Sequence, residues 1–73
     1  MFMTRPEKHS VTLHGHRTSV SLEVEFWQAF RRLAQDQGMT LNELAVRIDD
    51  ARGDTGLASA IRVFVLNSLL ARI

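Results

Sequence analysis

The sequence predicts a small, mainly α-helical domain that begins with a short β-ribbon. Three observations support this prediction. Arg17–Leu22 alternates strictly between polar and apolar residues, as a half-buried strand does. Two later segments, residues 26–34 and 41–48, repeat their apolar residues at the spacing of amphipathic helices. A third segment, from about Leu57 to Ala71, is apolar nearly all round a helix.

The predicted strand has two chemically different sides. One side carries Thr18, Val20 and Leu22, and the other carries Arg17, Ser19 and Ser21. Because successive side chains of a strand point to opposite faces, we expect the first side in the core and the second in solvent. The exposed side offers a guanidinium group and two hydroxyl groups, which can hydrogen-bond to base edges or to phosphate.

An upstream segment predicts a second strand. Its apolar residues, Val11 and Leu13, have odd numbers, whereas the apolar residues of the later strand have even numbers. A continuous strand would place the two sets on opposite faces, so the chain must turn or bulge between them. A type II′ turn at Gly15-His16 pairs Val11 with Val20 and gives one apolar and one polar face. The alternative is a single ribbon strand that follows a loose arm.

The first helix is expected to begin after Ser21 or Glu23 and to end before Gly38. Glycine readily adopts the left-handed conformation that is common just past a helix end. Trp27 could be an exposed recognition residue, but it lies on the apolar stripe of this helix and is expected in the core.

The second helix is expected to begin with a capping box, Thr40-x-x-Glu43, and to end near Arg52. A loop over residues 53–56 follows, in which Asp54 or Thr55 can cap the third helix. A helix that is apolar nearly all round lies either at the centre of a core or between subunits.

The length of 73 residues allows one domain, expected over residues 9–73, with residues 1–8 as a flexible N-terminal arm. The chain is 45% apolar, which is high for this length, so we expect a homodimer or a higher oligomer. The side chains expected in the shared dimer core are Val20, Leu22, Phe64 and Leu66. The lack of cysteine, of a signal sequence and of a membrane-spanning segment suits a cytoplasmic protein.

The positive charge of the chain gathers around the predicted strand. Residues 1–22 carry two arginines and one lysine against one acid, a net charge of +2. Residues 23–73 carry six arginines against seven acids, a net charge of −1. A basic excess beside the ribbon is what a nucleic-acid surface needs, although the difference is small.

No set of residues in the sequence predicts catalysis, so we expect neither an enzyme nor a bound cofactor. The loop over residues 53–56 lacks the lysine of a phosphate-binding loop. Asp49, Asp50 and Asp54 have no base or nucleophile beside them and are expected as solvated surface. His9, His14 and His16 lack a carboxylate or thiolate that would complete a metal site, so no metal is expected.

The order of these segments resembles the ribbon-helix-helix family of the Arc/MetJ type. The resemblance rests on Arg17–Leu22, on the helix through Leu33 and Ala34, and on the segment Gly38–Glu43. It covers residues 17 to about 50. The C-terminal segment that starts at Leu57 resembles a small bacterial subgroup with an added helix.

The resemblance implies that two chains intertwine, that their strands pair antiparallel, and that the ribbon enters the DNA major groove. The implied base contacts are Arg17, Ser19 and Ser21, and the implied phosphate contacts, at the start of the second helix, are Thr40, Leu41 and Asn42. The secondary candidates for DNA contact are Lys8, His14 and His16.

The expected function is therefore sequence-specific binding of double-stranded DNA by a homodimer, as in a bacterial transcriptional regulator. The competing interpretation is a protein-interaction module that uses the same dimeric scaffold without DNA. The net negative charge of residues 23–73 favours this second interpretation.

Overall fold

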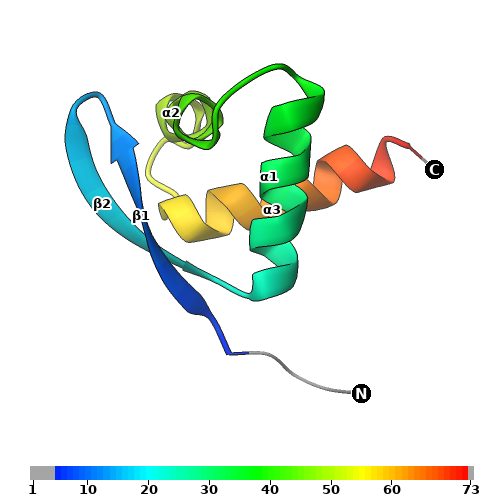
Figure 1. The fold of residues 1–73 in the computed structure, drawn as a ribbon, viewed down its shortest axis with the longest axis horizontal. Helices are drawn as coiled ribbons and strands as arrows, with labels where there is room; N and C mark the ends of the chain where they lie inside the picture. The colour runs from blue at the N-terminus through cyan, green and yellow to red at the C-terminus, as the bar shows by residue number, and fades with distance from the viewer. Residues whose placement is uncertain (1–4, 73) are drawn as a thin grey trace.

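The computed structural model describes residues 5–72, which form a β-hairpin followed by three helices (Figure 1). The elements are β1 (Glu7–Leu13), β2 (His16–Leu22), α1 (Val24–Asp36), α2 (Leu41–Ala51) and α3 (Leu57–Leu70). The predicted fold class and element order are confirmed, and the predicted hairpin, not the alternative single strand, is present. Residues 7 and 8, which were assigned to the arm, belong to β1, and residues 1–4 of the expected arm lie outside the described residues.

The hairpin turns at His14 and Gly15, not at Gly15-His16 as the sequence analysis expected. Both turn residues have positive φ, 50° at His14 and 80° at Gly15, which is the signature of a type I′ turn. That turn matches the right-handed twist of the flanking strands. Val11 consequently faces Thr18, and the expected pairing of Val11 with Val20 was wrong. The difference moves each partner by two residues, an even number, so every side chain keeps its predicted face.

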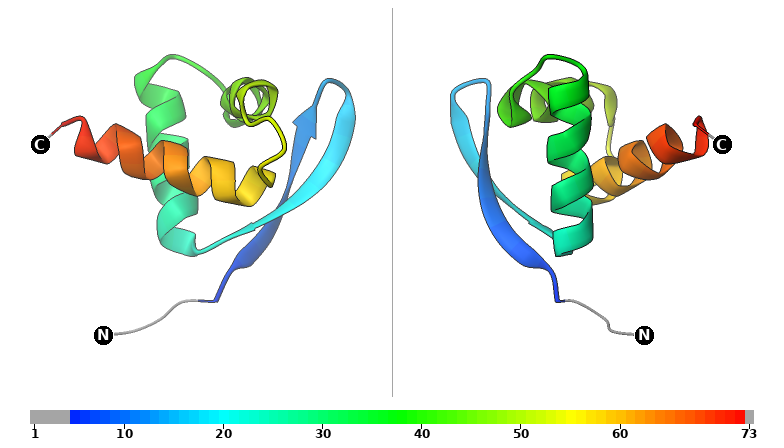
Figure 2. Two further views of the ribbon diagram at one scale, coloured as in Figure 1. Left: turned by 180° about the vertical axis from the view of Figure 1, so that it is seen from behind. Right: turned by 45° about the vertical axis from the view of Figure 1, so that its right-hand side comes forward.

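The apolar face of the hairpin packs against the helices. Val11, Val20 and Leu22 are at most 4% exposed, and they join a core with side chains from all three helices. The remaining core residues are Trp27, Phe30, Leu33, Ala34, Leu44, Ala45, Ile48, Ile61 and Val65. The hairpin curves along one side of the helices, so its other face lies on the outside of the molecule (Figure 2).

Trp27 lies at the centre of this packing, as predicted. Its side chain is fully buried, and its indole Nε1 donates a hydrogen bond of 2.9 Å to the carbonyl oxygen of Glu7. The ring of His9 meets the indole edge-on, with 4.8 Å between the ring centroids. Trp27 therefore fixes β1 to α1 through both apolar packing and a hydrogen bond.

The ends of α1 are set by backbone geometry. Glu23 is the N-cap, but its side chain caps nothing and instead accepts two hydrogen bonds from Arg62 of α3, at 3.0 and 3.2 Å. At the other end Gly38, with φ of 66°, donates to the carbonyl of Gln35, and Met39 donates to that of Ala34. This pair of bonds is a Schellman motif, and it confirms the predicted stop at Gly38.

The capping box of α2 is present, and the expected cap of α3 is not. The Thr40 hydroxyl accepts from the amide of Glu43, and the Glu43 carboxylate accepts from the amide of Thr40, at 3.1 and 2.9 Å. The N-cap of α3 is Gly56, without a side-chain hydrogen bond, so the assignment to Asp54 or Thr55 was wrong. The loop is closed instead by Arg52, whose guanidinium donates to the carbonyl of Thr55 at 2.6 Å.

Candidate nucleic-acid interface

The outer face of the hairpin carries only polar side chains, and we call it the polar ribbon face. Its residues are Lys8, Ser10, Thr12, Arg17, Ser19 and Ser21. They face one another across the strands in three pairs, Lys8 with Ser21, Ser10 with Ser19, and Thr12 with Arg17. All are exposed except Ser21, which is half-buried, and none is acidic.

The spacing of the polar ribbon face suits contacts along a duplex. Successive pairs on one face of a ribbon are two residues apart, about 6.8 Å. Two base-pair steps of B-DNA, at about 3.4 Å each, span the same distance. Hydroxyl groups can accept from or donate to any base edge, whereas the guanidinium of Arg17 has the fork geometry that fits the two acceptors of guanine.

The expected phosphate contacts lie at the start of α2, and the structure ties this helix end to the hairpin. The amide of Thr12 donates a 3.0 Å hydrogen bond to Oδ1 of Asn42, so the side chain of Asn42 is held by β1. Within residues 5–72 the amides of Leu41 and Asn42 donate to no protein acceptor, as is usual in the first turn of a helix. These two amides are the groups that a phosphate could accept from.

The charge of Glu43 works against an anion at this position. Hydrogen bonds with Thr40 lower the pKa of the Glu43 carboxyl group, and the bond from the backbone amide has a larger effect than the one with the side chain. The carboxylate is therefore ionised at neutral pH and lies at the positive end of α2. The amide of Thr40 is already occupied by this carboxylate, which leaves Leu41 and Asn42 as the available donors.

The secondary candidates do not lie together. Lys8 belongs to the polar ribbon face, whereas His16 pairs with Leu13 at the opposite face and is exposed. His14 is a turn residue, and its Nε2 lies 2.8 Å from Oδ1 of Asp50 in α2. The hydrogen bond and the charge of Asp50 raise the pKa of His14 above its ordinary value.

The three aspartates expected as solvated surface differ in their surroundings. Asp54 is exposed, and the side chain of Asp50 is 59% exposed, but a base does lie beside Asp50, because Nε2 of His14 is 2.8 Å away. Asp49 is only 21% exposed and pairs with Arg52 at 2.7 Å, so it is not a solvated carboxylate. Over residues 5–72 no three histidine or acidic side chains come close enough to hold a metal ion, and no helix is long and apolar enough to cross a membrane.

A family model described as a ribbon-helix-helix domain matches residues 6–69 of this chain. The chain belongs to the ribbon-helix-helix family. The match extends through α3, so it covers the hairpin and all three helices rather than the strand and two helices alone. No curated protein and no solved structure matches the chain.

This ribbon-helix-helix fold is typical of DNA-binding regulators, and here one chain forms a two-stranded ribbon by itself. Of the residues expected in a dimer core, Val20 and Leu22 are buried within the single chain. Phe64 is half-buried and Leu66 is 52% exposed. Only the two residues of α3 therefore remain accessible to a second subunit.

The residues predicted to contact bases all lie in β2, whereas the polar ribbon face also includes Ser10 and Thr12 of β1. The alternation of Ser10–Leu13 was a sufficient signal for both, since the same pattern identified the polar side of β2. The contacts of Thr12 with Asn42 and of His14 with Asp50 had no such signal. They join residues 30 and 36 positions apart, and only the packing of α2 beside β1 brings them together.

The contact between His14 and Asp50 predicts a pH-dependent contribution to stability. Because the folded pKa of His14 lies above 6.5, the contribution is complete below about pH 6.5 and is lost as the pH rises through the raised pKa. Asp50→Asn should therefore lower the free energy of unfolding more at about pH 5.5 than at about pH 8.5. Urea unfolding at both pH values tests this, with Asp54→Asn as the control. Equal losses at the two pH values would contradict the assignment.

Proposed function

We propose that this chain binds double-stranded DNA sequence-specifically as a homodimer, with the polar ribbon face in the major groove. In this proposal the protein is a transcriptional regulator of the bacterial cytoplasm. The observation that carries the proposal is the polar ribbon face itself, six polar side chains without an acid on the outside of a two-stranded ribbon. A ribbon of two strands is an element that the major groove, about 12 Å wide, admits.

Arg17 is the residue best suited to read a base. It is exposed at the turn end of the polar ribbon face, and within residues 5–72 it forms no ion pair. The guanidinium groups of Arg52 and Arg62, by contrast, are held by Asp49 and Glu23. A guanidinium without an internal partner can donate to both O6 and N7 of guanine without breaking a contact of the fold. Ser19 and Ser21 would add hydrogen bonds that adapt to either base.

The start of α2 is proposed to position the ribbon on the DNA backbone. The amides of Leu41 and Asn42 point out of the first turn, and the hydrogen bond of Asn42 to Thr12 fixes their place beside the ribbon. Phosphate contacts of this kind set the register of a protein on a duplex without carrying sequence information. Lys8, at the far end of β1 from the turn, would reach a second phosphate.

Replacement of Arg17 tests base reading. Arg17→Ala should weaken binding to the preferred sequence by about 1–3 kcal/mol and binding to random duplexes by less. The preferred sequence comes from selection out of a random duplex library, and fluorescence anisotropy at two salt concentrations gives the affinities. The control is Arg32→Ala, which removes the same charge from a side chain that is 75% exposed on α1.

Two results would overturn this assignment. If Arg17→Ala binds both duplexes as the parent does, the polar ribbon face serves a partner other than DNA, and the interaction module becomes the better description. If Arg32→Ala loses as much as Arg17→Ala on the preferred sequence, the loss reflects net charge and not a contact in the groove.

Replacement of Glu43 tests the phosphate site. Glu43→Gln keeps a carbonyl that accepts from the amide of Thr40, but it removes the negative charge beside the amides of Leu41 and Asn42. Binding should tighten on preferred and random duplexes alike, because a phosphate contact is independent of sequence. Asp54→Asn makes the same charge change in the loop before α3. Equal tightening in the two variants would place the phosphate away from the start of α2.

A further inference from the structure

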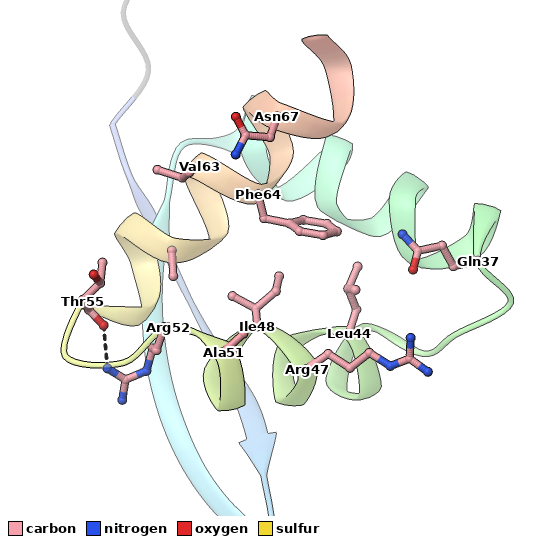
Figure 3. A pocket seen from close by; sticks show the side chains of 11 residues that line it. Gln37, Leu44, Arg47, Ile48, Ala51, Arg52, Thr55, Val63, Phe64 and Asn67 are labelled. Carbon is pink, nitrogen blue, oxygen red and sulfur yellow. Dashed lines mark hydrogen bonds between the residues drawn. The ribbon is translucent and has the colours of Figure 1, made fainter. Parts of the chain in front are cut away.

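A groove lies between α2 and α3, and we call it the α2–α3 groove. It encloses about 590 Å³, which is within the range of about 300–1,000 Å³ that is usual for ligand pockets. Figure 3 shows Phe64 pointing from α3 toward α2, opposite Leu44 and Ile48. Ala51, Ala60 and Val63 complete the apolar part of the lining. The walls of the groove therefore suit an apolar molecule.

The size of the α2–α3 groove fits a small molecule better than a segment of another protein. One turn of an α-helix with its side chains is about 10 Å wide and about 5.4 Å long, so it occupies roughly 400 Å³. The groove has room for little more than one such turn. Polar residues also mark its two ends, Gln37 at one and Arg52 with Thr55 at the other (Figure 3). The guanidinium of Arg52 donates to the carbonyl of Thr55, so the fold holds this second end in place.

The α2–α3 groove has one positive charge without an internal partner. Over residues 5–72 its lining includes two arginines and no acid. Arg52 is neutralised by Asp49 at 2.7 Å. Arg47 is exposed, and among the described residues it forms no hydrogen bond or ion pair. The carboxylate of Glu43, one turn earlier, is bound to the amide of Thr40, and Arg47 has the smallest of the effects that lower its pKa.

The polar groups of the lining suit a carboxylate. Figure 3 shows the guanidinium of Arg47 at the same end of the groove as Gln37, and Asn67 faces the groove from α3. A guanidinium can bind both oxygens of a carboxylate at once through its fork of N–H groups. The side-chain amides of Gln37 and Asn67 can donate further hydrogen bonds. An anion at this end would thus have its charge paired while its apolar part lies against the walls.

We propose that the α2–α3 groove binds a small molecule with one carboxylate and an apolar body, that is, a fatty or aromatic monocarboxylic acid. The carboxylate pairs with the guanidinium of Arg47. The apolar body packs between Leu44 and Ile48 of α2 and Phe64 of α3. No residue of the polar ribbon face lines the groove, so the ligand site goes beyond the proposed function and does not depend on DNA binding.

The charge of the groove sets the chemical class of the ligand. A cation would be repelled by Arg47 and would find no acid in the lining over residues 5–72. A phosphate monoester or a dicarboxylate would bring a second negative charge against apolar walls, where the guanidinium of Arg52 is already in use. A single carboxylate matches the single unpaired guanidinium.

Titration of the full-length, isotope-labelled protein, followed through its backbone amide signals by NMR spectroscopy, tests the proposal. The probes are octanoate, phenylbutyrate and naphthaleneacetate, and naphthaleneacetamide is the neutral match of the last. We expect saturable changes at Arg47, Ile48, Val63 and Phe64, and binding of the amide about tenfold weaker than that of the acid. Absence of saturable binding by all the acids, equal affinity for acid and amide, or changes confined to other residues would overturn the proposal.

Replacement of Arg47 tests the assigned charge pair. Arg47→Gln should weaken binding of naphthaleneacetate about tenfold and leave binding of naphthaleneacetamide unchanged, because only the acid has a charge to pair. The control is Arg32→Gln, which removes the same charge from a side chain that is 75% exposed on α1 and should bind both compounds as the parent does. Equal losses in the two variants would show a general effect of net charge and would overturn the assignment.

Filling the groove tests its position independently of charge. Ala51 is exposed and lines the groove, so Ala51→Leu adds apolar volume there without displacing core atoms. It should weaken binding of the acid and the amide alike, whereas Ser59→Leu, at an exposed position of α3 outside the lining, should weaken neither. Far-UV circular dichroism confirms that both variants fold. Unchanged binding by Ala51→Leu would place the ligand elsewhere. A second copy of the chain in the groove, shown by concentration-dependent signals of the lining residues without binding of any acid, would also refute the proposal.

Discussion

The packing of Trp27 against β1 is the contact on which the arrangement of the molecule depends. The indole is fully buried, it donates to the carbonyl of Glu7, and it meets the ring of His9 edge-on. A two-stranded hairpin is at best marginally stable alone and needs a helix to cover its apolar face. Removal of a buried tryptophan typically costs about 3–5 kcal/mol, which is a large part of the total stability of a small domain. This contact fixes the open end of the hairpin to α1, whereas the contacts of Thr12 with Asn42 and of His14 with Asp50 fix the turn end to α2.

The same contact links the fold to the proposed function. Because the apolar face of both strands packs against the helices, the alternation of the strands places Arg17, Ser10 and Ser19 on the outside. The hydrogen bond from Thr12 to Asn42 then holds the start of α2 beside the ribbon. The polar ribbon face and the proposed phosphate site at the start of α2 are therefore held together within a single chain.

Short sequence patterns correctly predicted the features that depend on neighbouring residues, namely the faces of the strands and the ends of the helices. Alternation identified both faces of the hairpin, the capping box at Thr40 was correct, and Gly38 ended α1 as expected. The predicted pairing of the two strands was wrong because the pairing depends on whether His14 or His16 joins Gly15 in the turn. The residue types of the turn are compatible with either choice. The cap of α3 was wrong because Arg52 and Thr55 satisfy the loop through each other, which leaves Gly56 at the helix start. Contacts between distant residues, such as His14 with Asp50, could not be predicted, since no periodicity encodes them.

In the proposed function, DNA contacts the outer face of the hairpin. The most direct measurement is a titration of the isotope-labelled protein with its selected duplex, followed through the backbone amide signals by NMR spectroscopy. We expect the largest changes at residues 8, 10, 12, 17, 19 and 21, with smaller ones at Leu41 and Asn42, and no more than minor changes along the outer side of α3. Changes confined to α3 and the groove beside α2, with the hairpin signals unmoved, would contradict it.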